Sequence, residues 1–387
     1  MRIAQIAPLY ESVPPRLYGG TERVVAYLTD ALTALGHDVT LFASGDSRTA
    51  ARLVAGRERA LRLDPEGGCD LPAHLLMLDE LLARGDEFDI FHFHTDCMQM
   101  PVFRHMAGRT VTTLHGRQDL QDLEPFYARF TSFPLVSISD HQREPVRFAN
   151  FVATVHHGLP ADLLDFTAEP AEGYLAFLGR IAPEKRPDRA IAIATRAGLP
   201  LKIAAKVDKA DEAYFREHIE PLLDHPLVDF IGEIGDADKS VFLGGARALL
   251  FPIDWPEPFG LVMIEAMACG TPVVAFRRGS VPEVVDDGVT GFIVDDLDDA
   301  IRVLGRLDEL DRRRVRATFD ARFSAEAMAR SYVRIYERLL SQEQRKIVAV
   351  PPELAVDAAP GSVPKAEPEQ VVAADALARR GPGRRPA

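Results

Sequence analysis

Residues 254–274 read DWPEPFGLVMIEAMACGTPVV, which contains a turn, a helix and the start of a strand. The two prolines among its first five residues favour an extended approach to the helix. From Phe259 the apolar and helix-favouring residues predict a short helix, which Gly270 ends with another proline just beyond. The two valines that follow predict a buried strand. Glu257 therefore lies on the loop before the helix, and Glu265 lies about two turns inside it.

The start of this helix is suited to binding an anion. The first N–H groups, those of residues 259–262, have no partner within the helix and lie at the positive end of its dipole. Gly260 lets a ligand approach the backbone closely. Glu257 and Glu265 would repel a phosphate, so they are better placed to accept hydrogen bonds from hydroxyl groups on either side of it. The alternative is an ordinary helix with one exposed glutamate and one glutamate near its cap. The spacing alone does not decide between them.

The composition is that of a globular chain with room for two domains. Of its 387 residues, 47% are hydrophobic and 27% are charged, which allows two cores of ordinary size. The net charge of -13 argues against binding to nucleic acid and allows at most peripheral contact with a membrane. Three widely spaced cysteines predict free thiols. Since we find no signal peptide and no apolar run of the roughly 20 residues that a membrane span needs, we expect a cytoplasmic protein.

The first half of the chain has the pattern of a doubly wound α/β domain. A short apolar strand is expected over residues 2–7, then a turn, a helix with apolar residues at helical spacing over 24–35, and a second strand over 37–43. This order is a βαβ start. Gly19 and Gly20 stand just before the helix, where they would allow a phosphate to approach. A plain turn is the alternative.

Histidines follow two further strands of this half. Residues 88–94 read FDIFHFH, which places His92 and His94 on one face of a strand. No third ligand follows at a usual spacing, so we prefer histidines at a strand end near a cleft to a metal site. The strand over 111–114 ends at His115. Ligands in open α/β sheets bind outside the carboxyl ends of the strands, so His115 is well placed to meet a substrate.

After an acidic connector the same pattern restarts. A strand over 174–178 leads to a glycine turn that carries Arg180 and Lys185. Two cations at such a turn suit a diphosphate, and a surface turn with ordinary basic residues is the alternative. Pairs of aspartates occur at 236–238 and at 296–298, a spacing that marks metal sites in other folds. Both pairs stand at turns or helix starts, so we interpret them as helix caps.

The domain organisation follows from these patterns. A helix that begins at Ser324 carries an aromatic and aliphatic face, which is typical of a buried helix and would brace the two domains. From about Lys346 the chain is rich in Pro, Ala, Val and Glu, a composition that cannot bury a core and predicts disorder. We therefore predict an N-terminal Rossmann-like domain over 1–158, a linker over 159–172, a C-terminal Rossmann-like domain over 173–323, a helix over 324–345 that packs back on the first domain, and a tail over 346–387.

Four motifs together resemble the GT-B glycosyltransferases of family 4, the retaining group that uses nucleotide sugars. The most specific runs from 257 to 292, EPFGLVMIE followed by ACGTPVVA, PEVV and TGF, and is similar to the E-x7-E signature of the family. The others are YGGTE at 18–22, LHG at 114–116 and GR with PEK at 179–185. The resemblance covers about residues 1–342. It implies a GT-B fold, in which two Rossmann-like, doubly wound domains face a cleft.

The resemblance also implies an activity and a set of site residues. The expected reaction transfers a hexosyl group from a UDP or GDP sugar to an acceptor hydroxyl, with retention of anomeric configuration and without a metal or other cofactor. The acceptor is left open as a sugar, a lipid-linked sugar or a small molecule. The expected donor-binding residues are Gly19, Gly20, Arg180, Lys185, Glu257, Phe259, Gly260, Leu261 and Glu265. The expected catalytic residues are His115, Glu257, Arg180 and Lys185.

Within this set, the resemblance gives each side chain a role. Arg180 and Lys185 would hold the diphosphate, Glu265 would bind the ribose, and Glu257 would bind the transferred sugar. His115 would lie beside the reacting centre as an orienting residue. Two other functions are compatible with the same motifs: a catalytically inactive module that binds sugar nucleotides, and an epimerase of the GT-B type.

Three segments depart from the usual pattern of the family. Residues 156–158 read HHG where Asn-Gly is common, so the domain junction is expected to differ. Residues 204–208 read AAKVD and lack a glycine-rich turn, which leaves recognition of the base open. Lys206 in that segment would add a phosphate contact. Residues 277–280 read RRGS, with bulky cations where small residues are usual. These cations either meet a charged substrate or are simply exposed.

Overall fold

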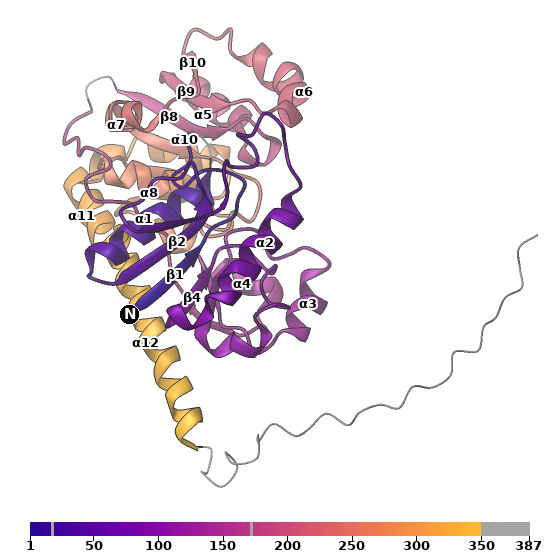
Figure 1. The fold of residues 1–387 in the computed structure, drawn as a ribbon. Helices are drawn as coiled ribbons and strands as arrows, with labels where there is room; N and C mark the ends of the chain where they lie inside the picture. The colour runs from indigo at the N-terminus through magenta and orange to yellow at the C-terminus, as the bar shows by residue number, and fades with distance from the viewer. Residues whose placement is uncertain (17–18, 171–172, 350–387) are drawn as a thin grey trace, which may run out of the picture. The chain divides into compact units, whose positions relative to one another are not determined.

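The computed structural model describes residues 1–16, 19–170 and 173–349, and residues 1–344 form one compact unit. The described strands form two parallel sheets, one in each half of the chain (Figure 1). Helices alternate with the strands in both halves, which confirms the predicted α/β class with two doubly wound halves. The tail predicted for 346–387 lies outside the described residues, apart from its first four residues, which end a helix.

In the first half, the described strands form a seven-stranded sheet with the order β3-β2-β1-β4-β5-β6-β7. The chain begins at β1, builds outward to β3, and then returns to continue from β4 to β7 on the other side. The order therefore switches between β1 and β4, which is where doubly wound folds bind ligands. The strands are β1 (Arg2–Ile6), β2 (Asp38–Ser44), β3 (Arg52–Arg57), β4 (Ile90–Phe93), β5 (Thr110–Thr113), β6 (Leu135–Ser137) and β7 (Phe151–Thr154). The α-helices are α1 (Gly20–Ala34), α2 (Asp70–Ala83), α3 (Leu123–Arg129) and α4 (Asp140–Arg143).

In the second half, the described strands form a six-stranded sheet with the order β10-β9-β8-β11-β12-β13. The same switch occurs between β8 and β11. The strands are β8 (Tyr174–Arg180), β9 (Leu201–Lys206), β10 (Val228–Gly232), β11 (Ala246–Phe251), β12 (Val273–Phe276) and β13 (Gly291–Val294). The α-helices are α5 (Pro187–Ala197), α6 (Glu212–Tyr214), α7 (Asp236–Gly244), α8 (Leu261–Ala268), α9 (Val281–Val284), α10 (Leu297–Leu304), α11 (Arg312–Arg322) and α12 (Ala325–Ala349).

Two element boundaries near the predicted site differ from the sequence prediction. Helix α8 begins at Leu261 and not at Phe259, because Gly260 has a left-handed backbone (φ 81°) that a right-handed helix cannot include. Glu265 is therefore the fifth helical residue, little more than one turn from the helix start instead of two. Strand β8 continues through Arg180, so this residue ends a strand and does not belong to the following turn.

The cores lie between the sheets and the helices that cover them. Every residue of β4 and of β12 is buried, as expected for central strands of a parallel sheet covered on both faces. The aromatic face of α12 reaches the first sheet. Tyr336 Oη lies 2.7 Å from His92 Nδ1, and Tyr332 Oη lies 2.8 Å from Thr113 Oγ1. The last helix is thus tied to the first half by buried polar contacts.

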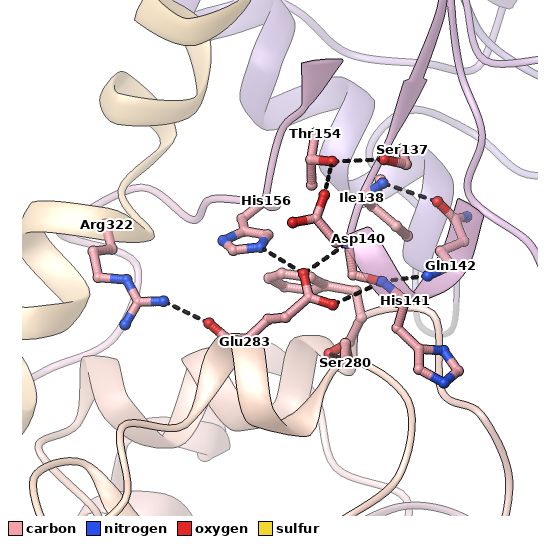
Figure 2. Close-up of polar contacts among 12 residues, drawn as sticks. Ser137, Ile138, Asp140, His141, Gln142, Thr154, His156, Ser280, Glu283 and Arg322 are labelled. Carbon is pink, nitrogen blue, oxygen red and sulfur yellow. Dashed lines mark hydrogen bonds and ion pairs between the residues drawn. The ribbon is translucent and has the colours of Figure 1, made fainter. Parts of the chain in front are cut away.

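The carboxylate of Glu283 connects the two halves. Glu283, on α9, accepts hydrogen bonds from the backbone N–H groups of Asp140 (2.6 Å) and His141 (2.8 Å) at the start of α4, as Figure 2 shows. His156, in the segment between β7 and the second half, places its Nε2 3.5 Å from the same carboxylate. Arg322 donates to the backbone carbonyl of Glu283. The first N–H groups of α4 lack partners within the helix, so Glu283 satisfies them from the other half of the chain.

Candidate active site

A cavity of about 580 Å³ opens at the carboxyl ends of strands from both sheets. Residues that follow β1, β4 and β5 line it from the first half, and residues at or after the ends of β8, β9 and β11 line it from the second. This is the expected ligand position in parallel sheets. Each site residue predicted from the sequence lines this cavity: Gly19, Gly20, His115, Arg180, Lys185, Glu257, Phe259, Gly260, Leu261 and Glu265. Their individual roles stay predictions.

The two glutamates of the opening stretch are both buried, with 8% of Glu257 and 5% of Glu265 exposed. The alternative of an ordinary helix with an exposed glutamate is therefore wrong. Glu257 Oε2 forms an ion pair with Lys185 Nζ and accepts a hydrogen bond of 3.0 Å from Trp255 Nε1. Lys185 Nζ also lies 4.8 Å from the centre of the Trp255 ring, within the range of a cation–π interaction.

The loop that carries Glu257 is fixed by the segment that precedes α9. Ser280 donates from its backbone N–H to Glu257 O (3.0 Å) and from its hydroxyl to Phe259 O (2.8 Å). Gly279 has a φ of 53°, and a Cβ there would lie only 2.3 Å from Glu257 O. The neighbouring Arg277 and Arg278 are exposed. Arg277 pairs with Asp295 and Arg278 with Asp254, and the glycine beside them is the residue of this segment that shapes the loop of Glu257.

Two helices begin at the cavity, one from each half. Gly19 precedes α1, which begins at Gly20, and Gly260 precedes α8. A Cβ at Gly20 would meet Leu261 Cδ1 at 3.7 Å, so the two helix starts lie close together. The first N–H groups and the positive dipole ends of both helices therefore belong to one cavity wall, which is an arrangement suited to an anion.

A network of ion pairs that the sequence did not predict surrounds Glu265. Lys239 Nζ lies 2.6 Å from Glu265 Oε1 and 3.1 Å from Asp236 Oδ1. Asp236 in turn forms an ion pair with Arg23, which comes from α1 in the first half. The interpretation of Asp236 as a helix cap is wrong, because Gly235 is the N-cap of α7 and makes no side-chain hydrogen bond. The spacing of Asp236 and Lys239, three residues apart at a helix start, was the available signal.

Arg180 and Lys206 lie among carboxylates of their own half. Arg180 Nη2 donates to Glu184 Oε1 at 2.6 Å, and its Nη1 lies 3.7 Å from Asp208 Oδ2 and 3.6 Å from Asp211 Oδ2. Lys206 Nζ lies 2.8 Å from Asp208 Oδ1. A phosphate at this wall would compete with these carboxylates for the same cations.

The second aspartate pair, at 296–298, behaves as predicted, since the Asp296 side chain caps α10.

Three histidines line the cavity from the first half, namely His94, His115 and His157. His94 Nδ1 lies 2.8 Å from His115 Nε2, and the rings of His115 and His157 are stacked with centres 5.2 Å apart. Desolvation lowers the pKa of His115 to about 3, so its ring is neutral near pH 7. Among the described residues, no group of three or more His, Cys, Asp or Glu side chains is arranged to hold a metal ion.

Comparison with known proteins assigns the family. Residues 18–143 match the family model described as Glycosyltransferase Family 4, and residues 166–316 match the model described as Glycosyl transferases group 1. The chain belongs to glycosyltransferase family 4. This glycosyltransferase is similar to a phosphatidyl-myo-inositol mannosyltransferase of Mycobacterium leprae, with 26% identity over 383 residues that cover 90% of this chain and 100% of the relative. The predicted class of enzyme is thereby confirmed.

Solved structures confirm the GT-B fold of the glycosyltransferase. AviGT4, a glycosyltransferase involved in avilamycin A biosynthesis, is similar with a TM-score of 0.64 and 25% identity, over 88% of this chain and 98% of AviGT4. Alr3699/HepE of Anabaena, solved in complex with UDP and glucose, is similar with a TM-score of 0.66 and 17% identity, over 87% of this chain and 99% of HepE. Within the described part of the glycosyltransferase, no helix is both long and apolar enough to cross a bilayer.

Proposed function

We propose that this glycosyltransferase moves a hexosyl group from a nucleoside-diphosphate sugar to an acceptor hydroxyl, with retention of anomeric configuration and without a metal ion. The observation that carries the proposal is that both signature glutamates are buried beside lysines of one cavity, Glu257 with Lys185 and Glu265 with Lys239. Cations and helix N–H groups suit a diphosphate, and carboxylates on either side of it suit hydroxyl groups. The binding of UDP and glucose by HepE, which has the same fold, supports this class of donor.

In this proposal, the donor replaces carboxylates as the ion-pair partner of the cations at the cavity wall. The diphosphate lies at the start of α8 and takes Lys185 and Arg180 from their carboxylate partners. Glu257 is then available to accept hydrogen bonds from hydroxyls of the transferred sugar, and Glu265 accepts them from the ribose. The ion pairs hold these side chains in place before the donor arrives, which reduces the reorganisation that binding requires.

The proposed transfer takes place on one face of the sugar. The bond between C1 of the sugar and the leaving phosphate oxygen breaks, and a bond from the acceptor oxygen to C1 forms on the same face. The proton of the acceptor hydroxyl passes to the departing phosphate oxygen. Arg180, Lys185 and the α8 start stabilise the charge that develops on the departing diphosphate, which is the role that a metal ion has in other transferases.

Trp255 offers a direct test of donor binding, because it is the only tryptophan in the sequence and contacts both Lys185 and Glu257. We would titrate UDP, GDP, ADP and their hexose derivatives while recording tryptophan fluorescence and the melting temperature. A ligand at a hundred times its Kd adds about 2.7 kcal/mol of stability. We expect one nucleotide series to change both signals, equally with and without EDTA. No response to any of them would contradict the proposal.

Turnover separates the proposal from the two other functions. The donor that binds is incubated with and without a panel of sugars, polyols and lipid-linked sugars, and the products are analysed by mass spectrometry and NMR. A new glycosidic bond with the anomeric configuration of the donor supports the proposal. A donor with an inverted hydroxyl, formed without an acceptor, would indicate an epimerase. Binding without any turnover, including slow hydrolysis of the donor, would indicate an inactive binding module.

A further inference from the structure

A chain of hydrogen bonds leads from the centre of the first sheet to His115. Gln5, the second-last residue of β1, is fully buried, and its Oε1 lies 2.8 Å from His94 Nε2. His94 Nδ1 lies 2.8 Å from His115 Nε2. The three side chains thus come from β1, from the residue after β4 and from the loop after β5. They form a relay that ends at the cavity wall.

The direction of this relay follows from the chemistry of its first member. The amide oxygen of Gln5 can only accept, so His94 Nε2 carries a proton and donates it. A neutral imidazole has one N–H, and His94 is neutral because burial lowers its pKa well below the usual value. His94 Nδ1 is therefore an acceptor, and His115 Nε2 donates to it. The remaining ring nitrogen of His115, Nδ1, then has a lone pair and no proton.

The other contacts of Gln5 agree with this direction. Gln5 Nε2 lies 3.3 Å from both the Tyr336 hydroxyl and His92 Nδ1, and the hydroxyl lies 2.7 Å from His92 Nδ1. An amide N–H that donates to the hydroxyl leaves the hydroxyl proton for His92 Nδ1, and His92 Nε2 then donates to Thr113 Oγ1 at 2.7 Å. In the described part of the chain, the ionisable groups that act on the charge of His94 are three other neutral histidines, His92, His115 and His157.

The relay leaves His115 with one unsatisfied group. His115 Nδ1 is buried and has no hydrogen-bond partner among the described residues, although the residue lines the cavity. A buried acceptor without a donor carries an uncompensated desolvation penalty. A neutral Nδ1 with a lone pair can take a hydrogen bond from a hydroxyl, and it cannot donate one to a phosphate oxygen.

We infer that Gln5 and His94 are positioning residues that set the tautomer of His115, so that its Nδ1 accepts a hydrogen bond from a hydroxyl of the transferred sugar. This inference rests on the proposed function for the nature of the ligand, but the tautomer itself is a property of the free protein. His115 in this state orients a hydroxyl and neither protonates the leaving phosphate nor carries a charge. This role of His115 differs from a steric one, because it depends on Gln5, a buried residue that does not itself line the cavity.

The first test is the tautomer in the protein without ligand. The full chain is labelled with ¹⁵N at histidine, and the ring nitrogens of His115 are assigned by comparison with His115→Asn. Long-range ¹H–¹⁵N correlation spectra distinguish a protonated from an unprotonated ring nitrogen. We expect a proton on Nε2 and none on Nδ1 at pH 7. A proton on Nδ1 would overturn the inference, whatever the outcome for the donor.

The second test reverses the direction of the hydrogen bond between His94 and His115. In Gln5→Glu, the new carboxylate stabilises a protonated His94, which donates from both nitrogens. His115 Nε2 must then accept, and the proton of His115 moves to Nδ1. We expect this change in the spectrum and a loss of donor turnover of roughly ten- to a hundredfold, recovered at high pH where His94 loses its extra proton. An unchanged tautomer together with an unchanged pH profile would overturn the inference.

A matched control distinguishes the relay from the effect of burying a charge. Gln99 is also fully buried in the first half, but its amide contacts Thr95 Oγ1, Thr112 Oγ1 and Asp96 O and no histidine. Gln99→Glu should leave the His115 tautomer unchanged. If Gln5→Glu does not fold, Gln5→Met serves instead, and we expect His115 to lose its single tautomer while the apolar side chain fills the same space. Retention of the Nε2–H form in Gln5→Met would count against the relay.

Discussion

Lys239 Nζ lies 2.6 Å from Glu265 Oε1, and both side chains are largely enclosed at the cavity wall, 12% and 7% exposed. Glu265 is therefore already paired with a lysine in the protein without ligand. Desolvation is the largest single effect on Lys239 and works against its charge, but the Coulomb attraction and hydrogen bond of Glu265, together with the attraction of Asp236, outweigh it and raise the pKa of the lysine. Lys239 therefore keeps its charge within the fold, and the stability of the site depends on both partners.

Lys239→Met should be costly for this reason. It leaves the Glu265 carboxylate buried without its cation, and breaking a buried pair in this way costs about 3–5 kcal/mol. Urea unfolding at pH 7 measures the loss. The double variant with Glu265→Gln removes the uncompensated charge and should recover much of it. If the double variant is no more stable than Lys239→Met, the pair does not have the energetic role that its geometry suggests.

Lys185→Ala tests the diphosphate side of the cavity. If Lys185 leaves Glu257 for a phosphate, its loss removes a cation from the transition state, and we expect donor turnover to fall by about 100- to 1,000-fold. The melting temperature should fall less than in Lys239→Met, because Lys185 is more exposed than Lys239 and its carboxylate partner stays bonded to Trp255. Arg278→Ala, at an exposed cation outside the cavity, is the control. Equal activity of both variants would remove Lys185 from the site.

The sequence predicted the parts of the site that lie in local motifs, and the family resemblance brought motifs from both halves of the chain together. Glu257, the turn before α8 and the glycines at the start of α1 follow from local rules for prolines, glycines and helix starts. The contact between Lys239 and Glu265 did not follow, because it depends on how α7 packs beside α8. The start of α8 was placed two residues too early, since the left-handed conformation of Gly260 is not visible in the periodicity of apolar residues. Gly279 was overlooked for a related reason, because its function lies in a close approach to a distant backbone.

Gly279→Ala should disturb the site through that close approach. The added Cβ would lie 2.3 Å from Glu257 O and 2.4 Å from Glu257 N, and both are backbone atoms that cannot rotate away. With the strain of a positive φ, we expect a loss of about 1–3 kcal/mol in stability and a larger relative loss of turnover. Gly288→Ala is a matched control, because its φ is 73° and nothing lies within 4 Å of its added Cβ. A similar loss of turnover in both variants would mean that strain alone explains the effect.

Glu283→Gln should weaken the connection between the halves and change its pH dependence. Burial disfavours the Glu283 carboxylate, but the hydrogen bonds from His156 and from the Asp140 and His141 backbone prevail and lower its pKa. Its stabilising contribution is therefore complete above the unfolded-state pKa of about 4.3 and disappears as the pH falls through the lower folded-state value. We expect Glu283→Gln to melt at a lower temperature than wild type at pH 7, with the gap closing near pH 3. Glu309→Gln, at an exposed ion pair with Arg306, should show a much smaller gap at pH 7.

Asp96→Asn should stabilise the protein, which would mark Asp96 as a residue kept for function. Asp96 follows β4 at the cavity wall and has a left-handed backbone (φ 52°), a conformation that asparagine also adopts readily. Its side chain is accessible in the cavity, but protein surrounds it closely enough that desolvation raises the pKa of its carboxyl group. A raised pKa means that the charged form costs stability above the folded-state pKa and that this cost disappears as the pH falls below the unfolded-state value of about 3.9. The melting temperature of Asp96→Asn should therefore exceed that of wild type at pH 7.5, and the difference should shrink toward pH 3.5. A variant that is less stable than wild type at pH 7.5 would show instead that the carboxylate supports the fold.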